Sequence, residues 1–501
     1  MTRRHFGSAA IGGSAFPGMS WLQQPSAPRN ILWIMTDQHR ASALGSSGDP
    51  VAKTPALDAL ARSGTCFENA YCTNPVCVPS RASLLSGLYT HHHKTWNNAT
   101  PMPFQVKTIA HHLAKSGYMS ALIGKMHFVD AQTHGFDYHL DFNDWMQYLG
   151  PKAQLFADEV GKPNSGSGLP QIDALWKDYG DPWAGHREAD GRRGLVPVGR
   201  VSKLAEQDHF ESFVTRESVR FLKNHGKKQP FLLIASYLKP HDPFMPAERF
   251  ARMFSKDDMK IPSTWGKTDL SRVPAEIRTS IENDWISPEL LNSPDNVKQR
   301  IAYYYANLAQ ADAAIGDLLR AAEELGLGQD TIVMYTSDHG EMLGEHGLWQ
   351  KMVFYEPAVR VPLMFRVPGL TRAGTRCRTH VSLASVLPTL LDLCGVKEGT
   401  FDGPSLAGDL REPEKERATT VFSEYALQSP RAKYMIREGR FKYCYYVNDT
   451  PELYDLESDP DEMQNLAGTP AGRDTAEKMQ ERLFAWYRPP EIGMRPAAPK
   501  R

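Results

Sequence analysis

The segment Cys77-Val-Pro-Ser-Arg81 contains a thiol, two residues that favour the start of a helix, and a permanent cation. Pro79 and Ser80 suit the first positions of a helix, so Cys77 would face a helix N-terminus, where negative charge is favoured. Such an environment suits a nucleophilic thiolate or an anionic substrate. A cysteine without these neighbours would more often be a structural thiol in the core.

A second candidate group is formed by Lys125 and His127, which follow a short apolar run at 120–123. If the chain stays extended there, side chains two residues apart project to the same side. An imidazole in that position could transfer a proton near neutral pH. In isolation, however, the pair would more often be a solvated lysine and a capping histidine.

The elements that must position these residues follow from hydrophobic periodicity. Short apolar runs that predict buried strands lie at 31–35, 120–123, 231–237, 331–335 and 361–365. Helical patterns lie between them, at 55–62, 81–85, 108–116, 208–224 and 297–325. The alternation predicts an α/β fold, with a large, mostly parallel sheet sandwiched by helices and polar clusters at the carboxyl ends of its strands.

Taken together, these segments resemble the type I sulfatase family, whose signature is Cys-x-Pro-Ser-Arg followed by a helix of small residues that ends in Gly. The resemblance extends from about residue 29 to about residue 466 and implies an alkaline-phosphatase-like fold. Its further matches are Asn30-Ile-Leu-Trp-Ile-Met-Thr-Asp-Gln38, Gly124-Lys-Met-His127, Pro240-His-Asp-Pro-Phe244, Ser337-Asp-His-Gly-Glu341, Gly347-Leu-Trp-Gln-Lys351, Arg360-Val-Pro-Leu363, Glu452-Leu-Tyr-Asp-Leu456 and Asn465-Leu466.

The resemblance implies that a maturase oxidises Cys77 to formylglycine, an aldehyde whose hydrate carries two hydroxyl groups on one carbon. One hydroxyl would attack sulfur, and the other would later drive the release of sulfate. An ordinary serine nucleophile would instead form a sulfate ester that needs a second attack by water at sulfur. The implied reaction is therefore covalent catalysis with its own release step.

The resemblance also implies a divalent metal, held by Asp37, Gln38, Asp338, His339 and the modified Cys77. Two carboxylates at the ends of two strands suit a hard cation that acidifies the nucleophile and binds a sulfate oxygen. Each carboxylate alone would more often be a loop cap or a salt-bridge partner. Many relatives have a second Asp in place of Gln38, and His339 offers nitrogen, so calcium is the first assignment while magnesium and manganese stay open.

The remaining site residues are implied in the same way. Lys125 matches a residue that holds the nucleophile and sulfate, and His127 one that takes the proton from the second hydroxyl. His241 matches the histidine at the bridging ester oxygen, and Lys351 a lysine that binds sulfate. With Arg81, these cations would stabilise the transferring sulfuryl group as several cations stabilise a phosphoryl group.

The alternation of predicted strands and helices is interrupted at 140–205, where many Gly, Pro, Asp and Trp residues predict a long insertion. From about 396 the pattern changes to short strands at 419–425, 433–437, 441–447 and 452–456, with a hairpin turn at Glu438-Gly439 and a helix at about 473–486. We therefore expect a catalytic domain at 29–395 and a C-terminal α+β subdomain at 396–501. We expect the insertion and the C-terminal subdomain to determine the substrate specificity.

The N-terminal segment Thr2-Arg-Arg-His-Phe6, followed by a mildly apolar stretch at 8–19, is typical of a twin-arginine signal. Its alternative is a disordered basic tail. We expect residues 1–28 to direct export to the periplasm, and no apolar run is long enough for a transmembrane helix. The six cysteines match no zinc pattern, and a Cys66–Cys72 or Cys377–Cys394 disulfide is open.

Composition excludes some functions. The 57 Lys and Arg balance the 58 Asp and Glu, and no block of like charge stands out, so a general nucleic-acid binder is not expected. The expected substrate is a sulfated glycan or small molecule. The alternatives are a phosphonate monoester or phosphodiester hydrolase that uses the same site, and a non-catalytic protein that binds an anion or a glycan. His91-His92-His93 is not expected to bind a metal.

Overall fold

The computed structural model describes residues 30–129, 132–153, 155, 198–282 and 293–490. The expected export signal and most of the expected insertion at 140–205 lie outside the described residues.

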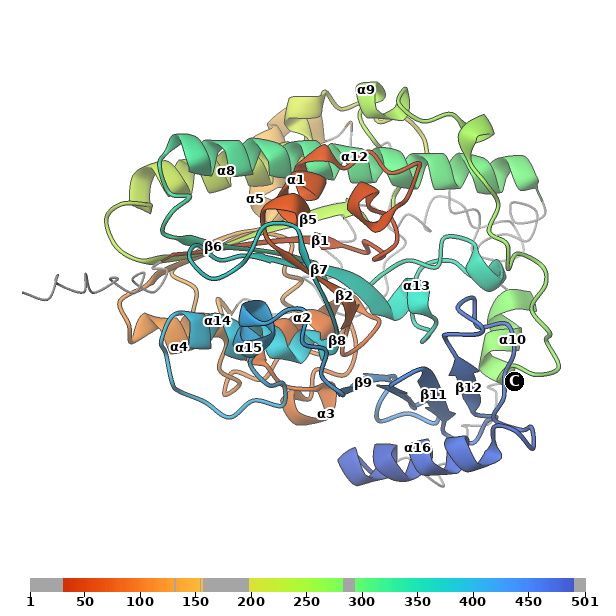
Figure 1. The fold of residues 1–501 in the computed structure, drawn as a ribbon. Helices are drawn as coiled ribbons and strands as arrows, with labels where there is room; N and C mark the ends of the chain where they lie inside the picture. Colours follow the sequence, from red (N-terminus) through yellow and green to blue (C-terminus); the bar gives the residue numbers. More distant parts are fainter. Residues whose placement is uncertain (1–29, 130–131, 154, 156–197, 283–292, 491–501) are drawn as a thin grey trace, which may run out of the picture.

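The centre of the fold is an eight-stranded sheet with the order β4-β3-β5-β1-β6-β7-β2-β8 (Figure 1). Its neighbouring strands are parallel, except that β7 runs antiparallel to both β6 and β2. Central strands β1, β5 and β6 are buried along their whole length, because helices cover both faces. The expected α/β sandwich is confirmed. The strands are β1 (Asn30–Asp37), β2 (Thr65–Tyr71), β3 (Met119–Gly124), β4 (Tyr138–Leu140), β5 (Phe231–Pro240), β6 (Thr331–Ser337), β7 (Arg360–Arg366) and β8 (Thr375–Ser382).

Two layers of helices enclose this sheet (Figure 1). On one face lie α1 (Pro55–Ser63), α5 (Phe142–Leu149), α8 (Phe210–His225) and the long α12 (Pro294–Glu324). On the other lie α2 (Cys77–Ser86), α3 (Thr90–His93), α4 (Ile109–Ala114), α14 (Val386–Leu393) and α15 (Ala407–Arg411). Further helices are α9 (Glu248–Ala251), α10 (Ala275–Glu282) and α13 (Glu356–Val359).

Strands β2, β4 and β8 were not predicted from the sequence. Strand β2 mixes buried and half-buried positions and contains Glu68 and Asn69, so it has no continuous apolar run. Strand β8 begins Thr-Arg-Cys-Arg at one edge of the sheet, and the three-residue β4 lies at the other. Edge strands are half exposed, and polar residues on their open side weaken the hydrophobic signal.

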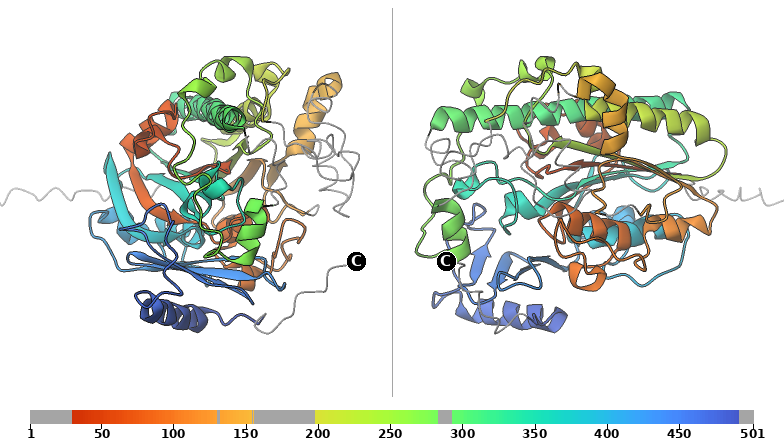
Figure 2. Two further views of the ribbon diagram at one scale, coloured as in Figure 1. Left: turned by 90° about the vertical axis from the view of Figure 1, so that its right-hand side faces the viewer. Right: turned by 180° about the vertical axis from the view of Figure 1, so that it is seen from behind.

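A second, antiparallel sheet follows, with the order β12-β11-β10-β9. It contains β9 (Thr420–Tyr425), β10 (Lys433–Glu438), β11 (Phe441–Tyr446) and β12 (Glu452–Asp455), as the sequence predicted within one or two residues. Glu438 pairs with Phe441 across the hairpin, where Gly439 adopts a left-handed φ of 52°. Helix α16 (Arg473–Trp486) covers the outer face of this sheet (Figure 2). The domain boundary at 395 stays a prediction.

Two expectations concern covalent and membrane structure. All six cysteines are free thiols, so neither candidate disulfide is present. Cys377 and Cys394 lie on β8 and at the end of α14, and Cys66 lies within β2 while Cys72 follows it. Among the described residues, no helix combines the length and the apolar character that a bilayer crossing requires.

Candidate active site

The candidate residues meet at the carboxyl ends of four adjacent strands, β3, β5, β1 and β6. Asp37 ends β1, and Lys125, His241 and Asp338 each directly follow one of the other three strands. Polar side chains gather there because the ends of parallel strands open toward one edge of an α/β sheet. Cys77 begins α2 on the neighbouring face, and its Sγ lies 3.8 Å from the Asp37 carboxylate.

Four buried side chains form a compact group of metal-ligand type. Ligand atoms of Asp37, Cys77, Asp338 and His339 all lie within 4.8 Å of one another. Cys77 Sγ is 3.2 Å from His339 Nε2. His339 Nδ1 donates to the carbonyl oxygen of Gly340 at 3.0 Å, so Nε2 is the ring nitrogen that faces the group. Burial acts to lower the pKa of His339, but the charges of Asp338 and Cys77 raise it above its usual value.

Arg81 is positioned to balance the two carboxylates. Its Nε lies 2.7 Å from Asp338 Oδ2, and one terminal nitrogen lies 2.8 Å from Asp37 Oδ2. The side chain is 1% exposed. Arg81 is therefore held by the carboxylates, and its terminal nitrogens also reach Ser236 Oγ and the carbonyl oxygen of Lys125.

The charges around Cys77 favour an anion at its Sγ. Burial and the Asp37 carboxylate act to raise the pKa of the Cys77 thiol. Lys125 and Lys351 outweigh them, and the pKa lies well below its usual value. Burial also acts to raise the pKa of Asp37, but Lys125, whose Nζ is 2.7 Å from the carboxylate, and neighbouring cations hold it well below its usual range.

Lys125 and His127 line one hollow together with Cys77, so they face the same side, as predicted. The predicted cause, an extended chain, was wrong. The chain does not stay extended, because His127 has a left-handed φ of 65°. The imidazole is buried, and neither ring nitrogen has a hydrogen bond of standard geometry among the described residues. Burial lowers the pKa of His127, which favours a neutral ring able to accept a proton.

His241 and Lys351 form a direct pair. Nζ of Lys351 lies 2.8 Å from Nε2 of His241 and also donates to Oε1 of Gln38. His241 Nδ1 donates to the carbonyl oxygen of Asp242, so Nε2 accepts from the lysine. All sequence-predicted site residues therefore lie in one connected cluster.

The sequence analysis gave no role to Asp242, Glu341 and Gln350, which surround Gln38. The Nε2 group of Gln38 donates to Asp242 Oδ1 at 3.1 Å and to Glu341. Gln350 Nε2 donates to the other oxygen of Asp242 at 2.8 Å, and the Gln350 backbone N–H donates to Glu341 at 2.7 Å. Gln38, Asp242, Gln350 and Glu341 thus form a closed ring of hydrogen bonds. The only signal in the sequence was that these residues stand within or beside the quoted motifs.

The three histidines at 91–93 form hydrogen bonds with three different residues. His91 Nδ1 meets Glu424 at 2.9 Å, His92 Nδ1 meets Asp402 at 2.7 Å, and His93 Nε2 meets Ser83 at 3.0 Å. Each therefore has its own structural partner, and the expectation that this tract is not a metal site stays a prediction.

The ring around Gln38 generates a stability prediction. Gln38→Glu would place a third carboxylate between Asp242 and Glu341, and like charges in a buried site repel strongly. We expect a loss of about 2–4 kcal/mol in the free energy of unfolding, measured by urea titration in the presence of a chelator. Adding Glu341→Gln should restore at least about 1.4 kcal/mol, as a double-mutant cycle would show.

Glu345→Gln is the matched control, because Glu345 lies four residues further along, 22% exposed and paired with Arg40. It should not rescue Gln38→Glu. Equal rescue by both changes, or none by Glu341→Gln, would show that the two carboxylates do not set the charge at position 38.

Two protein-family models match this chain. The family model described as Sulfatase matches residues 29–396. A second family model, described as N-sulphoglucosamine sulphohydrolase, C-terminal, matches residues 344–488. A choline-sulfatase of Rhizobium meliloti (strain 1021) is 31% identical over 452 residues, which cover 88% of this chain and 83% of the relative. An N-acetylglucosamine-6-O-sulfatase of Bacteroides thetaiotaomicron is 27% identical over 504 residues, covering 88% of this chain and 82% of the relative.

Solved structures share the fold. The phosphonate monoester hydrolase of Agrobacterium radiobacter superposes with a TM-score of 0.74 at 23% identity, covering 91% of this chain and 95% of the other. A structure in complex with its substrate D-glucosamine-2-N,6-O-disulfate gives a TM-score of 0.70 at 23% identity, covering 94% of this chain and all of the other (100%). Because the sulfatase model spans residues 29–396 and the choline-sulfatase relative is 31% identical, the chain belongs to the type I sulfatase family of sulfuric ester hydrolases.

Proposed function

We propose that this protein hydrolyses sulfate esters of carbohydrates and that Cys77, oxidised to formylglycine by a maturase, supplies the nucleophile. The observation that carries the proposal is the position of Cys77, buried at the start of α2 between the Asp37, Asp338 and His339 group and the Lys125 ammonium. A nucleophile in that position faces both a metal-ligand set and cations able to hold sulfate oxygens.

The donor set fits a divalent metal. Asp37 and Asp338 offer carboxylate oxygens, and His339 presents the lone pair of Nε2 because its Nδ1 is already bonded. The Gln38 amide directs its nitrogen toward two carboxylates, so its oxygen faces the site, where it accepts from Lys351 and keeps a second lone pair. When bound, the metal would polarise a sulfate oxygen and acidify the nucleophilic hydroxyl. Calcium is the first assignment, and the imidazole nitrogen keeps magnesium and manganese open.

The chain's own cations would hold the sulfate. Lys125 and Lys351 both act on the charge at Cys77, and Arg81 neutralises the carboxylates beneath it. Charge that develops on the sulfuryl oxygens would thus meet positioned donors in a site shielded from water.

The two histidines would act at different steps. Nε2 of His241 accepts a hydrogen bond from the Lys351 ammonium, so the lysine could pass a proton to Nε2, which would then donate it to the departing alcohol. His127 is buried with a lowered pKa, which suits removal of a proton from the second hydroxyl of the hydrate as sulfate leaves.

Sulfated carbohydrate is favoured as the substrate by the names of similar proteins. They include the N-acetylglucosamine-6-O-sulfatase, an ulvan-active sulfatase of Formosa agariphila and the structure bound to a glucosamine disulfate. The twin-arginine segment at the N-terminus supports export to the periplasm, where such glycans would be met.

A phosphonate monoester hydrolase is the second candidate, because two structural neighbours at 23% identity carry that name. Steady-state rates on 4-nitrophenyl sulfate and 4-nitrophenyl phenylphosphonate should separate the two. We expect a higher kcat/KM for the sulfate. A higher value for the phosphonate would overturn the proposal, and absence of turnover on both would favour a binding protein.

The first prediction concerns the state of Cys77. Protein made together with a maturase should yield a peptide in which the sulfur is replaced by oxygen with the loss of two hydrogens, as measured by mass spectrometry. Cys77→Ala should abolish turnover and leave the fold intact. Fully active protein that contains only the free thiol would refute the mechanism.

The second prediction concerns the metal. Asp338→Asn keeps the shape of the side chain and removes one negative charge from the ligand group, so the metal content measured by plasma mass spectrometry should fall to background and turnover should be lost. Circular dichroism should show an unchanged fold. Asp402→Asn, which removes a partly exposed carboxylate paired with His92, is the control and should keep both metal and activity.

The third prediction separates His241 from His127. His241→Ala should slow esters of basic alcohols far more than esters of acidic phenols, because a good leaving group hardly needs a proton. His127→Ala should instead release one equivalent of alcohol and stop, leaving a sulfated peptide at residue 77. Metal content must match the parent in both variants. Equal losses for every leaving group, with no trapped sulfate, would show that the two roles are wrongly assigned.

A further inference from the structure

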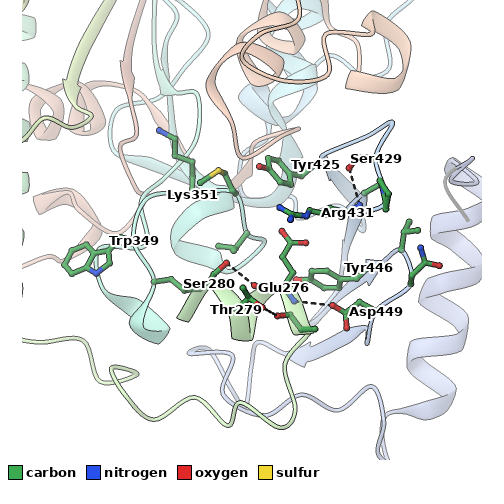
Figure 3. Close-up of a pocket in the computed structure, with 18 residues that line it drawn as sticks. Glu276, Thr279, Ser280, Trp349, Lys351, Tyr425, Ser429, Arg431, Tyr446 and Asp449 are labelled. Carbon is green, nitrogen blue, oxygen red and sulfur yellow. Dashed lines mark hydrogen bonds between the residues drawn. The ribbon is translucent and has the colours of Figure 1, made fainter. Parts of the chain in front are cut away.

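A wide hollow adjoins the catalytic cluster at Lys351 (Figure 3). Its volume is about 750 Å³, within the range of ordinary ligand pockets. One wall is formed by α10 and the segment that carries Lys351, and the other by the loops of the C-terminal sheet. The two parts of the fold therefore share it.

A second, narrower hollow contains Cys77 itself, together with Lys125, His127 and His241, and measures about 70 Å³. That volume is about two water molecules and suits a sulfate group rather than a sugar ring. Lys351 lines the wide hollow and His241 the narrow one, and their side chains are 2.8 Å apart. If the proposed function holds, sulfate occupies the narrow hollow and the rest of the substrate extends past this pair into the wide one.

The acidic and aromatic side chains of the wide hollow are already engaged by the protein. The buried ammonium of Lys433 is 3.0 Å from Glu276 and lies 4.8 Å from the ring centre of Tyr425 and 5.6 Å from that of Tyr446. A quaternary ammonium ligand needs free aromatic faces and a free acid. The protein's own lysine takes that position here, so a cationic ligand is disfavoured.

Arg431 is the cation of this hollow that remains available. It is exposed, and among the residues that the structure describes it has no ion-pair partner within 4 Å. Its guanidinium points into the hollow between Tyr425 and Glu276 (Figure 3). The backbone of this loop is held in place, because Arg431 N–H donates to Ser429 Oγ at 3.2 Å and Ala432 N–H to the carbonyl oxygen of Ser429 at 3.0 Å.

The remaining polar groups suit hydroxyl-rich ligands. Thr279 and Ser280 line the hollow together with Asn448, and their hydroxyls donate to the carbonyl oxygens of Ala275 and Glu276, so they face a ligand as acceptors. Asp449 lies on the side of the hollow beside Glu276, where its Oδ2 accepts from the backbone N–H of Glu276 at 3.3 Å (Figure 3). Hydroxyls, an amide and a carboxylate are the groups that exchange hydrogen bonds with sugar hydroxyls. A planar guanidinium is matched to carboxylate or sulfate oxygens, which it can bind with two parallel hydrogen bonds.

We infer that the wide hollow binds a sulfated sugar that carries a second anionic group, a carboxylate or another sulfate, and that Arg431 is the specificity-determining residue that holds this group. The inference rests on the proposed function and names the substrate class within it. Lys351 and Arg431 then recognise two anions at opposite ends of one ligand.

The test compares matched sugars. In the first arm, the 2-, 3- and 4-sulfates of methyl glucuronoside and methyl galacturonoside carry a carboxylate that the corresponding glucoside and galactoside sulfates lack. In the second arm, the 2,6-, 3,6- and 4,6-disulfates of the methyl glucoside and galactoside carry a second sulfate instead. Sulfate release is measured by ion chromatography. At least one dianionic sugar should exceed its monoanionic partner by about tenfold or more in kcat/KM, through KM, since a charge-assisted hydrogen bond contributes about 1.5–3 kcal/mol.

The variant Arg431→Gln should remove that preference and leave the rate on 4-nitrophenyl sulfate unchanged, whereas Arg431→Lys should keep part of it. Arg473→Gln, an exposed arginine at the start of α16 and outside the hollow, is the control and should change nothing. If the preference lost in Arg431→Gln is the one for uronoside sulfates, the second anion is a carboxylate; if it is the one for disulfates, the second anion is a sulfate.

Calorimetric binding of the same sugars to the Cys77→Ala chain gives a readout without turnover. Equal affinities for every matched pair, or a preference that survives Arg431→Gln, would overturn the inference. Turnover of 4-nitrophenyl sulfate decides the proposed function separately, so the two can fail independently.

Discussion

One buried guanidinium connects the ends of four strands, and the active site depends on it. Arg81 meets Asp37 at the end of β1 and Asp338 after β6, and it also donates to Ser236 in β5 and to the carbonyl oxygen of Lys125 after β3. A planar cation with several fixed N–H directions can serve all of these acceptors at once, which an ammonium cannot. Two carboxylates can be kept together in a dry interior only with such compensation, because an unpaired buried charge is very costly.

The backbone around the cluster is strained in the same region. Gln38, His127, Gln350 and Met352 are not glycines, yet all have φ between 64° and 77°. Non-glycine residues rarely adopt this left-handed conformation, and they persist in it where the surrounding structure enforces it. Here the enforcing contacts are the carboxylates around Gln38 and, for Met352, a backbone hydrogen bond to the carbonyl oxygen of Pro75.

Buried polar contacts connect the C-terminal sheet to the segment that carries Lys351, the proposed sulfate-binding lysine. Glu452 of β12 accepts hydrogen bonds from Tyr355, Tyr446 and Tyr454 at 2.6–2.9 Å. Tyr355 follows Lys351 on the same segment, and Tyr446 lines the wide hollow. The Lys442 ammonium, fully buried in β11, pairs with Glu356 at the start of α13 and with Glu462. Buried hydrogen bonds and ion pairs thus join the element that would bind the substrate to the segment that carries Lys351.

The sequence by itself determined the types of element, the order of the motifs and the gathering of polar residues at the ends of the central strands. Those features are local, because a buried strand, an amphipathic helix and a turn each leave a periodic pattern in a short segment. The tertiary structure alone decided which atoms meet. It turned His127 toward Cys77 by a left-handed backbone rather than by strand alternation, and it surrounded Gln38 with Asp242 and Glu341. It also added the edge strands β4 and β8 and left Arg431 facing a shared hollow, because such contacts join segments far apart in the chain and arise only when the layers pack.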